Sequence, residues 1–305
     1  RLEIFTPTEL QVGEDYFETF QSKNPKTIQA IGLLHKNLKQ ASEKIRQQQG
    51  DKQADPISKK ELSENQKLLV DVDFVHLHNH TQFSVLQSTI SVASLVKAAI
   101  HQKMPAVAIT DHANLMGAFH FVRDIINHNK AAVAKNAAAV ENGEEPTEKT
   151  IKPIVGCEFF VCEDHLDKSR KDNGYQIVLL AKNKKGYHNL AKMSSIAYTD
   201  GFYYVPRIDK NVINKYKEDL IVLSGNLYGE VPNKLLNLGE NQAEEALLWW
   251  KAEFGSDCYL ELMRHNQEDE NRVNEGLIAL AQKHDVKVVA TNNVFYVNKE
   301  DANAH

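Results

Sequence analysis

From residue 72 onward the chain alternates short apolar runs with stretches of helical period. Seven runs have the length and composition of strands, and patterns whose apolar residues recur every three or four positions separate most of them. Such alternation predicts parallel strands joined by crossover helices, hence a barrel or a doubly wound sheet. A polar stretch, NGEEPTEKT, is inserted in the second crossover. The seven runs are VDFVHLH, AVAIT, KPIVGCEFFV, YQIVLLA, DLIVLSG, CYLELM and VKVVATNN.

Residues 1–72 differ from the rest of the chain in composition and in the spacing of their apolar residues. Residues 1–48 predict helices because their apolar residues recur on one face. The next segment, residues 49–72, is polar and predicts a linker, which leaves 73–305 for the α/β domain. The chain lacks an initiator Met and ends at DANAH directly after a strand-like run, so we expect an excised piece of a longer protein.

Composition narrows the class of protein. The 36 basic and 41 acidic residues give a net charge of -5, which is not typical of a surface dedicated to nucleic acid. No apolar run approaches the roughly 20 residues of a membrane span, and no secretory signal opens the chain. The odd number of cysteines favours reduced thiols. We therefore expect a cytoplasmic protein with no membrane partner.

Three histidines alternate along the stretch FVHLHNHTQFSV, at His76, His78 and His80. In a strand, alternate side chains share a face, so the rings would project to one side of the sheet. Neutral imidazoles at this spacing can converge on a divalent cation. The alternative is an edge strand whose histidines are solvated or bonded to backbone, and the motif alone leaves both interpretations open.

Polar residues also follow several of the other predicted strands. In parallel α/β folds the carboxyl ends of strands gather on one rim, where sites are built. The sequence therefore predicts a site at this rim. The residues at strand exits, besides the histidines, are Asp111, His112, Glu158, Asn226, Asn292 and Asn293.

A family resemblance rests on long blocks that occur in order: HLHNHTQFS, KMPAVAITDHANLMGAFHF, IKPIVGCEFFV, LLAKNKKGYHNLAKMSSIAYTDGFYYVPRID, LIVLSG, VVATNN and EDANAH. Residues 73–305 closely resemble the polymerase and histidinol phosphatase (PHP) domain that opens bacterial DNA polymerase III alpha subunits. The resemblance implies a distorted seven-stranded (β/α) barrel. Residues 1–48 resemble the tail and connector of alpha chains that carry a fused proofreading 3′-5′ exonuclease.

The resemblance also implies a setting for the domain. The parent chain would be a DNA-directed DNA polymerase that requires Mg²⁺ and works in the cytoplasm. Its partners would be the polymerase core and exonuclease of the same chain, primer-template DNA, the sliding clamp and the clamp loader. On this reading the fragment by itself is inactive.

Active PHP domains hold a cluster of about three metal ions, and the resemblance gives the ligand positions one by one. Ligand chemistry is kept at His76, His78, His112 and Glu158. Amides are weak ligands for transition metals, phenylalanine is none, and lost carboxylates no longer hold several cations close together. We therefore expect lost phosphoesterase activity and a structural platform. An empty site and a single weak Zn²⁺ or Mn²⁺ both stay open. The degenerate positions are Gln87, Gln176, Asn226, Asn293 and Phe295.

Two other functions compete with the platform interpretation: an active metal-dependent PHP phosphoesterase or 3′-5′ exonuclease, and an amidohydrolase barrel. The ligand substitutions count against the first. The second would need a bridging Lys and a final Asp, which the strand exits do not offer. Contacts with DNA or a neighbouring domain are predicted at Lys182, Lys184, Lys185 and Arg207, the last of which follows the aromatic residues Phe202, Tyr203 and Tyr204. The alternative is a solvated turn beside aromatic residues packed in the core. The remaining histidines, His80 among them, are predicted to be structural or on the surface.

Overall fold

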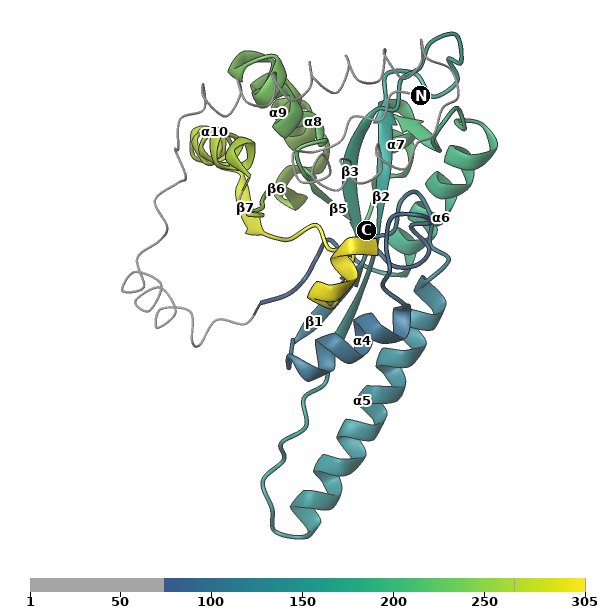
Figure 1. Cartoon of the computed structure of the whole chain (residues 1–305), viewed down its shortest axis with the longest axis vertical. Helices are drawn as coiled ribbons and strands as arrows, with labels where there is room; N and C mark the ends of the chain where they lie inside the picture. The colour runs from purple at the N-terminus through teal and green to yellow at the C-terminus, as the bar shows by residue number, and fades with distance from the viewer. Residues whose placement is uncertain (1–73, 266, 305) are drawn as a thin grey trace, which may run out of the picture. The chain divides into compact units, whose positions relative to one another are not determined.

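The computed structural model describes residues 74–265 and 267–304. The predictions for 1–48 and 49–72 lie outside these residues. The described part contains a curled mixed sheet in the order β1-β2-β3-β5-β6-β7, with β4 paired to β2 (Figure 1). The strands are β1 (Ala106–Ile109), β2 (Lys152–Cys162), β3 (Tyr175–Ala181), β4 (Arg207–Asp209), β5 (Leu220–Leu223), β6 (Cys258–Leu262) and β7 (Lys287–Ala290).

Helices cover the sheet, and several begin at side chains that cap them. Ser91, Asn183 and Asp209 accept hydrogen bonds from backbone N–H groups of the first turns of α4, α6 and α7. None of the described helices is long and apolar enough to cross a membrane. The helices are α4 (Val92–His101), α5 (Ala118–Glu141), α6 (Lys184–Thr199), α7 (Lys210–Tyr216), α8 (Glu230–Asn237), α9 (Glu240–Phe254) and α10 (Glu268–His284), with the short 3-10 helices η1 (Gly255–Asp257) and η2 (Lys299–Ala304).

Six of the seven predicted runs form strands, but one of them runs against its neighbours. β3 is antiparallel to both β2 and β5, whereas the β1–β2, β5–β6 and β6–β7 pairs are parallel. The reason is the connection: residues 163–174 between β2 and β3 contain no helix, so the chain turns back instead of crossing over. The expectation of parallel strands was wrong at β3.

The first predicted run, VDFVHLH, does not form a regular strand in its described residues. Its backbone nevertheless closes the barrel. On one side the N–H of Ala108 donates to the carbonyl of His76, and on the other the N–H of His80 donates to the carbonyl of Val294. The Asn79 amide donates to backbone carbonyls of His76 and Ala108, at 3.0 and 2.9 Å. The segment 76–80 therefore lies between β1 and the residues after β7, and the predicted distorted (β/α) barrel is confirmed.

The polar insertion, residues 142–150, follows α5 and forms a projecting arm with it. This helix has 24 residues, and its second half projects from the barrel (Figure 1). The side chains of Asn129 and Asn136 bond with the backbone of Ile151 and Glu148, which ties the returning segment to the helix. Two large buried clusters pack helices against the sheet: one joins α4 and α5 to β1, and a larger one joins α6 to α10 to strands β2 to β6. A small third cluster lies between β3 and β5.

Candidate metal centre

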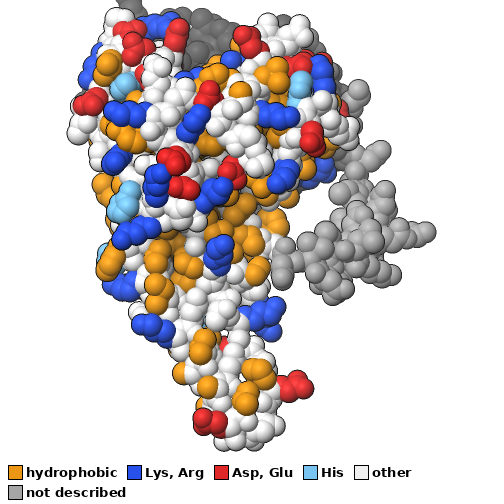
Figure 2. All heavy atoms as spheres, turned by 180° about the vertical axis from the view of Figure 1, so that it is seen from behind, with side chains coloured by type: hydrophobic (Ala, Val, Ile, Leu, Met, Phe, Trp, Pro, Cys, Tyr) orange, Lys and Arg blue, Asp and Glu red, His pale blue; other side chains and the backbone are white. Residues whose placement is uncertain are grey.

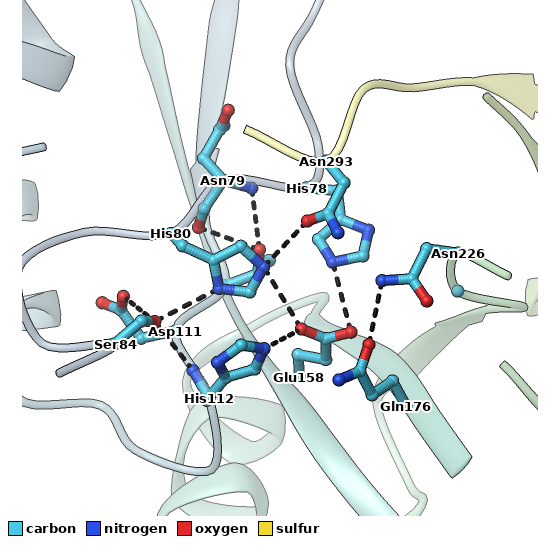
Figure 3. Close-up of polar contacts among 12 residues, drawn as sticks. His78, Asn79, His80, Ser84, Asp111, His112, Glu158, Gln176, Asn226 and Asn293 are labelled. Carbon is cyan, nitrogen blue, oxygen red and sulfur yellow. Dashed lines mark hydrogen bonds and ion pairs between the residues drawn. The ribbon is translucent and has the colours of Figure 1, made fainter. Parts of the chain in front are cut away.

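A buried cluster of imidazoles surrounds one carboxylate inside the barrel. Figure 3 shows His78, His80 and His112 pointing toward Glu158. One ligand atom from each of His78, His80 and Glu158 lies within 4.8 Å of the others. Nε2 of His112 lies 2.6 Å from Oε2 of Glu158. The segment 76–80, the residues after β1 and the middle of β2 together bring these groups to one point.

His78 lies between two carboxylates. Its Nε2 is 3.5 Å from Glu158 and its Nδ1 is 3.2 Å from Glu261, and all three side chains are fully buried. Burial pulls the pKa of His78 down, but Glu261 and Glu158 outweigh it and raise the pKa to about 10. Burial likewise raises the pKa of Glu158, while His78 and His112 outweigh it and hold that pKa well below its usual range.

His80 lies at the centre of the cluster in a different electrostatic setting. Its Nε2 is 3.2 Å from Glu158 and 3.0 Å from Oδ1 of Asn293, and its Nδ1 is 3.2 Å from the hydroxyl of Ser84. Burial lowers the pKa of His80 to about 4, although Glu158 opposes this. The aromatic ring of Phe295 stacks on the imidazole with centroids 4.3 Å apart. Burial therefore favours the neutral form of His80, the form that ligates metals, whereas His78 would have to release a proton to bind a cation.

Several nitrogen and oxygen atoms of this cluster, which could ligate a metal, are buried without a well-aligned hydrogen bond. They are Nε2 of His78, Nε2 of His112 and both carboxylate oxygens of Glu158. These atoms approach one another to between 2.6 and 3.5 Å, so they converge without satisfying each other's hydrogen-bond geometry. Convergent nitrogen and oxygen donors fit a single divalent cation such as Zn²⁺.

Comparison with known proteins gives the family. The family model of the PHP domain matches residues 76–265. This chain belongs to the PHP domain family. Similar proteins include the DNA polymerase III subunits alpha of Borreliella burgdorferi, 37% identical over 235 residues, and Aquifex aeolicus, 40% identical over 243 residues. Each match covers 76% of this chain and 19% of the relative, so the chain spans about a fifth of these proteins.

Two solved structures are similar in shape to this PHP domain. A proposed metal-dependent phosphoesterase from Bifidobacterium adolescentis has a TM-score of 0.45 at 14% identity, over 73% of this chain and 88% of that one. An amidohydrolase from Chromobacterium violaceum has a TM-score of 0.44 at 12% identity, over 74% and 89% of the two chains.

The positions that the family resemblance gave as substituted ligands have interactions of their own. The Asn226 amide donates to Oε1 of Gln176 at 2.9 Å, so these two amides bind each other (Figure 3). Asn293 and Phe295 both lie against His80. Gln87 lies exposed in the loop before α4. These positions bring no additional charged or imidazole ligand to the cluster.

His76 does not lie with the residues that the sequence grouped with it. Its ring packs edge-on against Phe74 at 4.8 Å and lines a separate cavity of about 240 Å³. His80 takes its place beside His78, although its sequence context predicted a structural or surface role. The cause is the backbone: segment 76–80 has no continuous ladder, so strict alternation of three rings on one face does not hold.

Two further carboxylates near the cluster are occupied by hydrogen bonds. Asp111 accepts from Thr81 and Ser84 at 2.6 to 2.7 Å, and burial raises its pKa. Glu261 accepts from the N–H of Gly225 at 2.7 Å and from the hydroxyl of Thr291 at 2.8 Å. Glu261 was missed, although a single acid inside the apolar run CYLELM could have indicated it.

The predicted contact residues fall into two groups. Lys182, Lys184 and Lys185 are exposed around the start of α6, where Lys182 pairs with Asp257 at 2.7 Å. Arg207 is fully buried. Its guanidinium donates to four backbone carbonyls, so its position does not suit the predicted contact with DNA. The acceptors are Gly201, Asp172, His165 and Asp167, at 2.9 to 3.2 Å.

Proposed function

We propose that this chain is the PHP portion of a DNA polymerase III alpha chain, in which the barrel is a catalytically degenerate platform between an exonuclease and a polymerase core. The relatives named DNA polymerase III subunit alpha support the assignment. The parent would be a cytoplasmic DNA-directed DNA polymerase that needs Mg²⁺ and carries a fused 3′-5′ exonuclease. Its partners would be primer-template DNA, the sliding clamp and the clamp loader.

One observation carries the proposal of degeneracy: the amides of Gln176 and Asn226 bind each other at 2.9 Å. At two positions where an active PHP domain presents ligands, this chain presents a closed pair of neutral groups. Phe295 adds a ring stacked on His80 where a third ligand would stand. Hydrolysis by such centres depends on several ions that activate water and clamp a phosphoryl group. The residues present do not fit such a cluster.

The residues do fit one ion. His78, His80 and Glu158 would hold it, with His112 as the fourth donor, and Zn²⁺ or Mn²⁺ suits nitrogen and oxygen ligands. With four protein donors, a bound ion would cross-link the elements that carry them, as in a closed structural site. The chain's own contribution is to link segment 76–80, the exit of β1 and the middle of β2 inside the barrel. We assign the site a structural role.

The test compares hydrolysis with restoration of ligands. We expect the purified 305-residue chain to hydrolyse neither p-nitrophenyl phosphate nor a 3′-labelled primer above the level of His80→Ala, with Mn²⁺ or Zn²⁺ added. A restored variant, Gln87→Asp/Gln176→His/Asn226→His/Asn293→Asp/Phe295→His, should bind at least two metal equivalents. Hydrolysis by the wild-type chain that disappears in His80→Ala would overturn the proposal and favour an active phosphoesterase or exonuclease.

A further inference from the structure

A groove of about 970 Å³ runs between α5 and one end of strands β2, β3 and β5, and it shares no residue with the metal cluster. Its floor is apolar and is formed by Pro153 and Ile154 of β2, Leu180 of β3 and Ile221 of β5. Its wall is the first half of α5. Figure 2 shows hydrophobic side chains gathered over the middle of the molecule and down the projecting arm, with Lys and Arg side chains among them.

The apolar surface continues along α5 at a fixed interval. Phe119, Ile126, Val133 and Val140 follow one another every seven residues and are 71%, 43%, 58% and 61% exposed. At ~1.5 Å per residue the stripe is about 32 Å long. Apolar residues on the surface of a monomer are usually scattered, whereas exposed apolar residues at seven-residue intervals along one helix match the spacing of one position of a helix-pairing heptad. The stripe therefore predicts a helical partner.

Positively charged side chains lie beside this stripe. Arg123 and Lys130 stand between successive apolar residues of the stripe, four residues after Phe119 and Ile126. With Lys152, Lys182 and Lys184 they make five cations in the groove lining, and none of the described lining residues is acidic. Arg123 pairs with Asp124 and Lys182 with Asp257. Within the described ranges 74–265 and 267–304 no acidic residue pairs with the other three.

We infer that the groove and the α5 stripe bind an amphipathic helix of a partner protein, whose apolar face is flanked by carboxylates. The apolar floor and the seven-residue repeat match the apolar face of such a helix. The five cations match its acidic flanks, which would steer association and set orientation. The inference goes beyond the proposed function, because the groove would bind this helix whether or not the barrel retains hydrolytic activity.

Nucleic acid fits the same surface less well. Single strands are bound by aromatic faces and a basic track along the backbone, yet the exposed stripe is mostly aliphatic. It continues onto an arm where Lys135 is paired with Glu148 and the position four residues after Val133 carries no cation. Ala137 occupies that position on α5. The lower half of the arm is therefore suited to a protein helix and offers little to phosphates.

The experiment uses the 305-residue chain and designed helical peptides of 21 residues with leucine on one face and either glutamate or lysine flanks. Fluorescence anisotropy should show that the glutamate peptide binds the wild-type chain at least tenfold more tightly than the lysine peptide. In Arg123→Glu/Lys130→Glu this preference should reverse. The matched control Lys97→Glu/Lys168→Glu reverses two exposed cations outside the groove and should keep the wild-type preference. Ile126→Ser should weaken binding of both peptides.

Three outcomes would overturn the inference. Equal affinity for the two peptides would remove the role of charge. A preference that survives Arg123→Glu/Lys130→Glu would place binding elsewhere. Binding of a labelled single-stranded oligonucleotide that the double reversal abolishes, without peptide selectivity, would assign the surface to nucleic acid. None of these depends on metal content or hydrolysis, so failure here is distinguishable from failure of the platform proposal.

Discussion

Arg207 gives the sharpest test of the packing around the β4 edge of the sheet. Its buried guanidinium makes four hydrogen bonds to backbone carbonyls of residues 165–172 and Gly201, and no carboxylate among the described residues forms an ion pair with it. Arg207→Met keeps the apolar stem and removes all donors. Each carbonyl left without a partner costs ~1 kcal/mol, at the low end because water reaches most of them. We therefore expect a loss of about 3 to 4 kcal/mol.

Urea unfolding followed by tryptophan fluorescence measures this loss, because Trp249 and Trp250 lie on α9 and Trp250 is buried. The matched control is Lys184→Met, which removes an exposed cation and should change stability by less than about 0.5 kcal/mol. A loss below about 1 kcal/mol in Arg207→Met would refute the reasoning and return Arg207 to the surface role that the sequence indicated.

Two further changes test the barrel closure and an electrostatic contact. Asn79→Ala removes two side-chain bonds to backbone carbonyls of neighbouring segments and should cost about 2 kcal/mol in the same urea assay; an unchanged midpoint would contradict the role given to Asn79. Burial raises the pKa of Glu230, but Lys210 and Lys234 outweigh it, so the net pKa is lowered. A lowered carboxyl pKa contributes stability above about pH 4.3, and this stability is lost as pH falls through the folded pKa. Glu230→Gln should therefore be less stable than wild type at pH 6, with the difference shrinking at pH 3; a constant difference would contradict the assignment.

The alternation of strands with helices predicted a barrel or a doubly wound sheet, and the family resemblance implied the barrel that the structure has. The prediction failed where hydrogen bonds from one side chain to the backbone determine the local backbone conformation. The Asn79 side chain bonds to the backbone in segment 76–80, so the segment departs from a regular strand and His80 replaces His76 beside His78. β3 runs antiparallel to β2 because the loop between them contains no helix. Counting the strand-like runs in the sequence does not give their direction.

The sequence could predict those site residues whose place follows from the strand on which each one lies. His78, His112 and Glu158 were grouped correctly in space, since each follows or lies in a buried run. Glu261 and the pairing of Gln176 with Asn226 come from strands far apart in sequence, and only the register of β2, β3, β5 and β6 brings them together. The predicted contact of Arg207 with DNA or a neighbouring domain rested on its charge and aromatic neighbours, whereas its burial depends on the loop 165–172, whose carbonyls accept its hydrogen bonds.

Metal content tests the central claim most directly. The measurement is elemental mass spectrometry of the 305-residue chain, purified without chelators or a metal-affinity tag, beside His80→Ala and His76→Ala. A degenerate site built on His78, His80 and Glu158 predicts no more than one equivalent of Zn²⁺ or Mn²⁺, absent from His80→Ala and unchanged in His76→Ala. Two or more equivalents in the wild-type chain, or metal that persists in His80→Ala and is lost in His76→Ala, would contradict it.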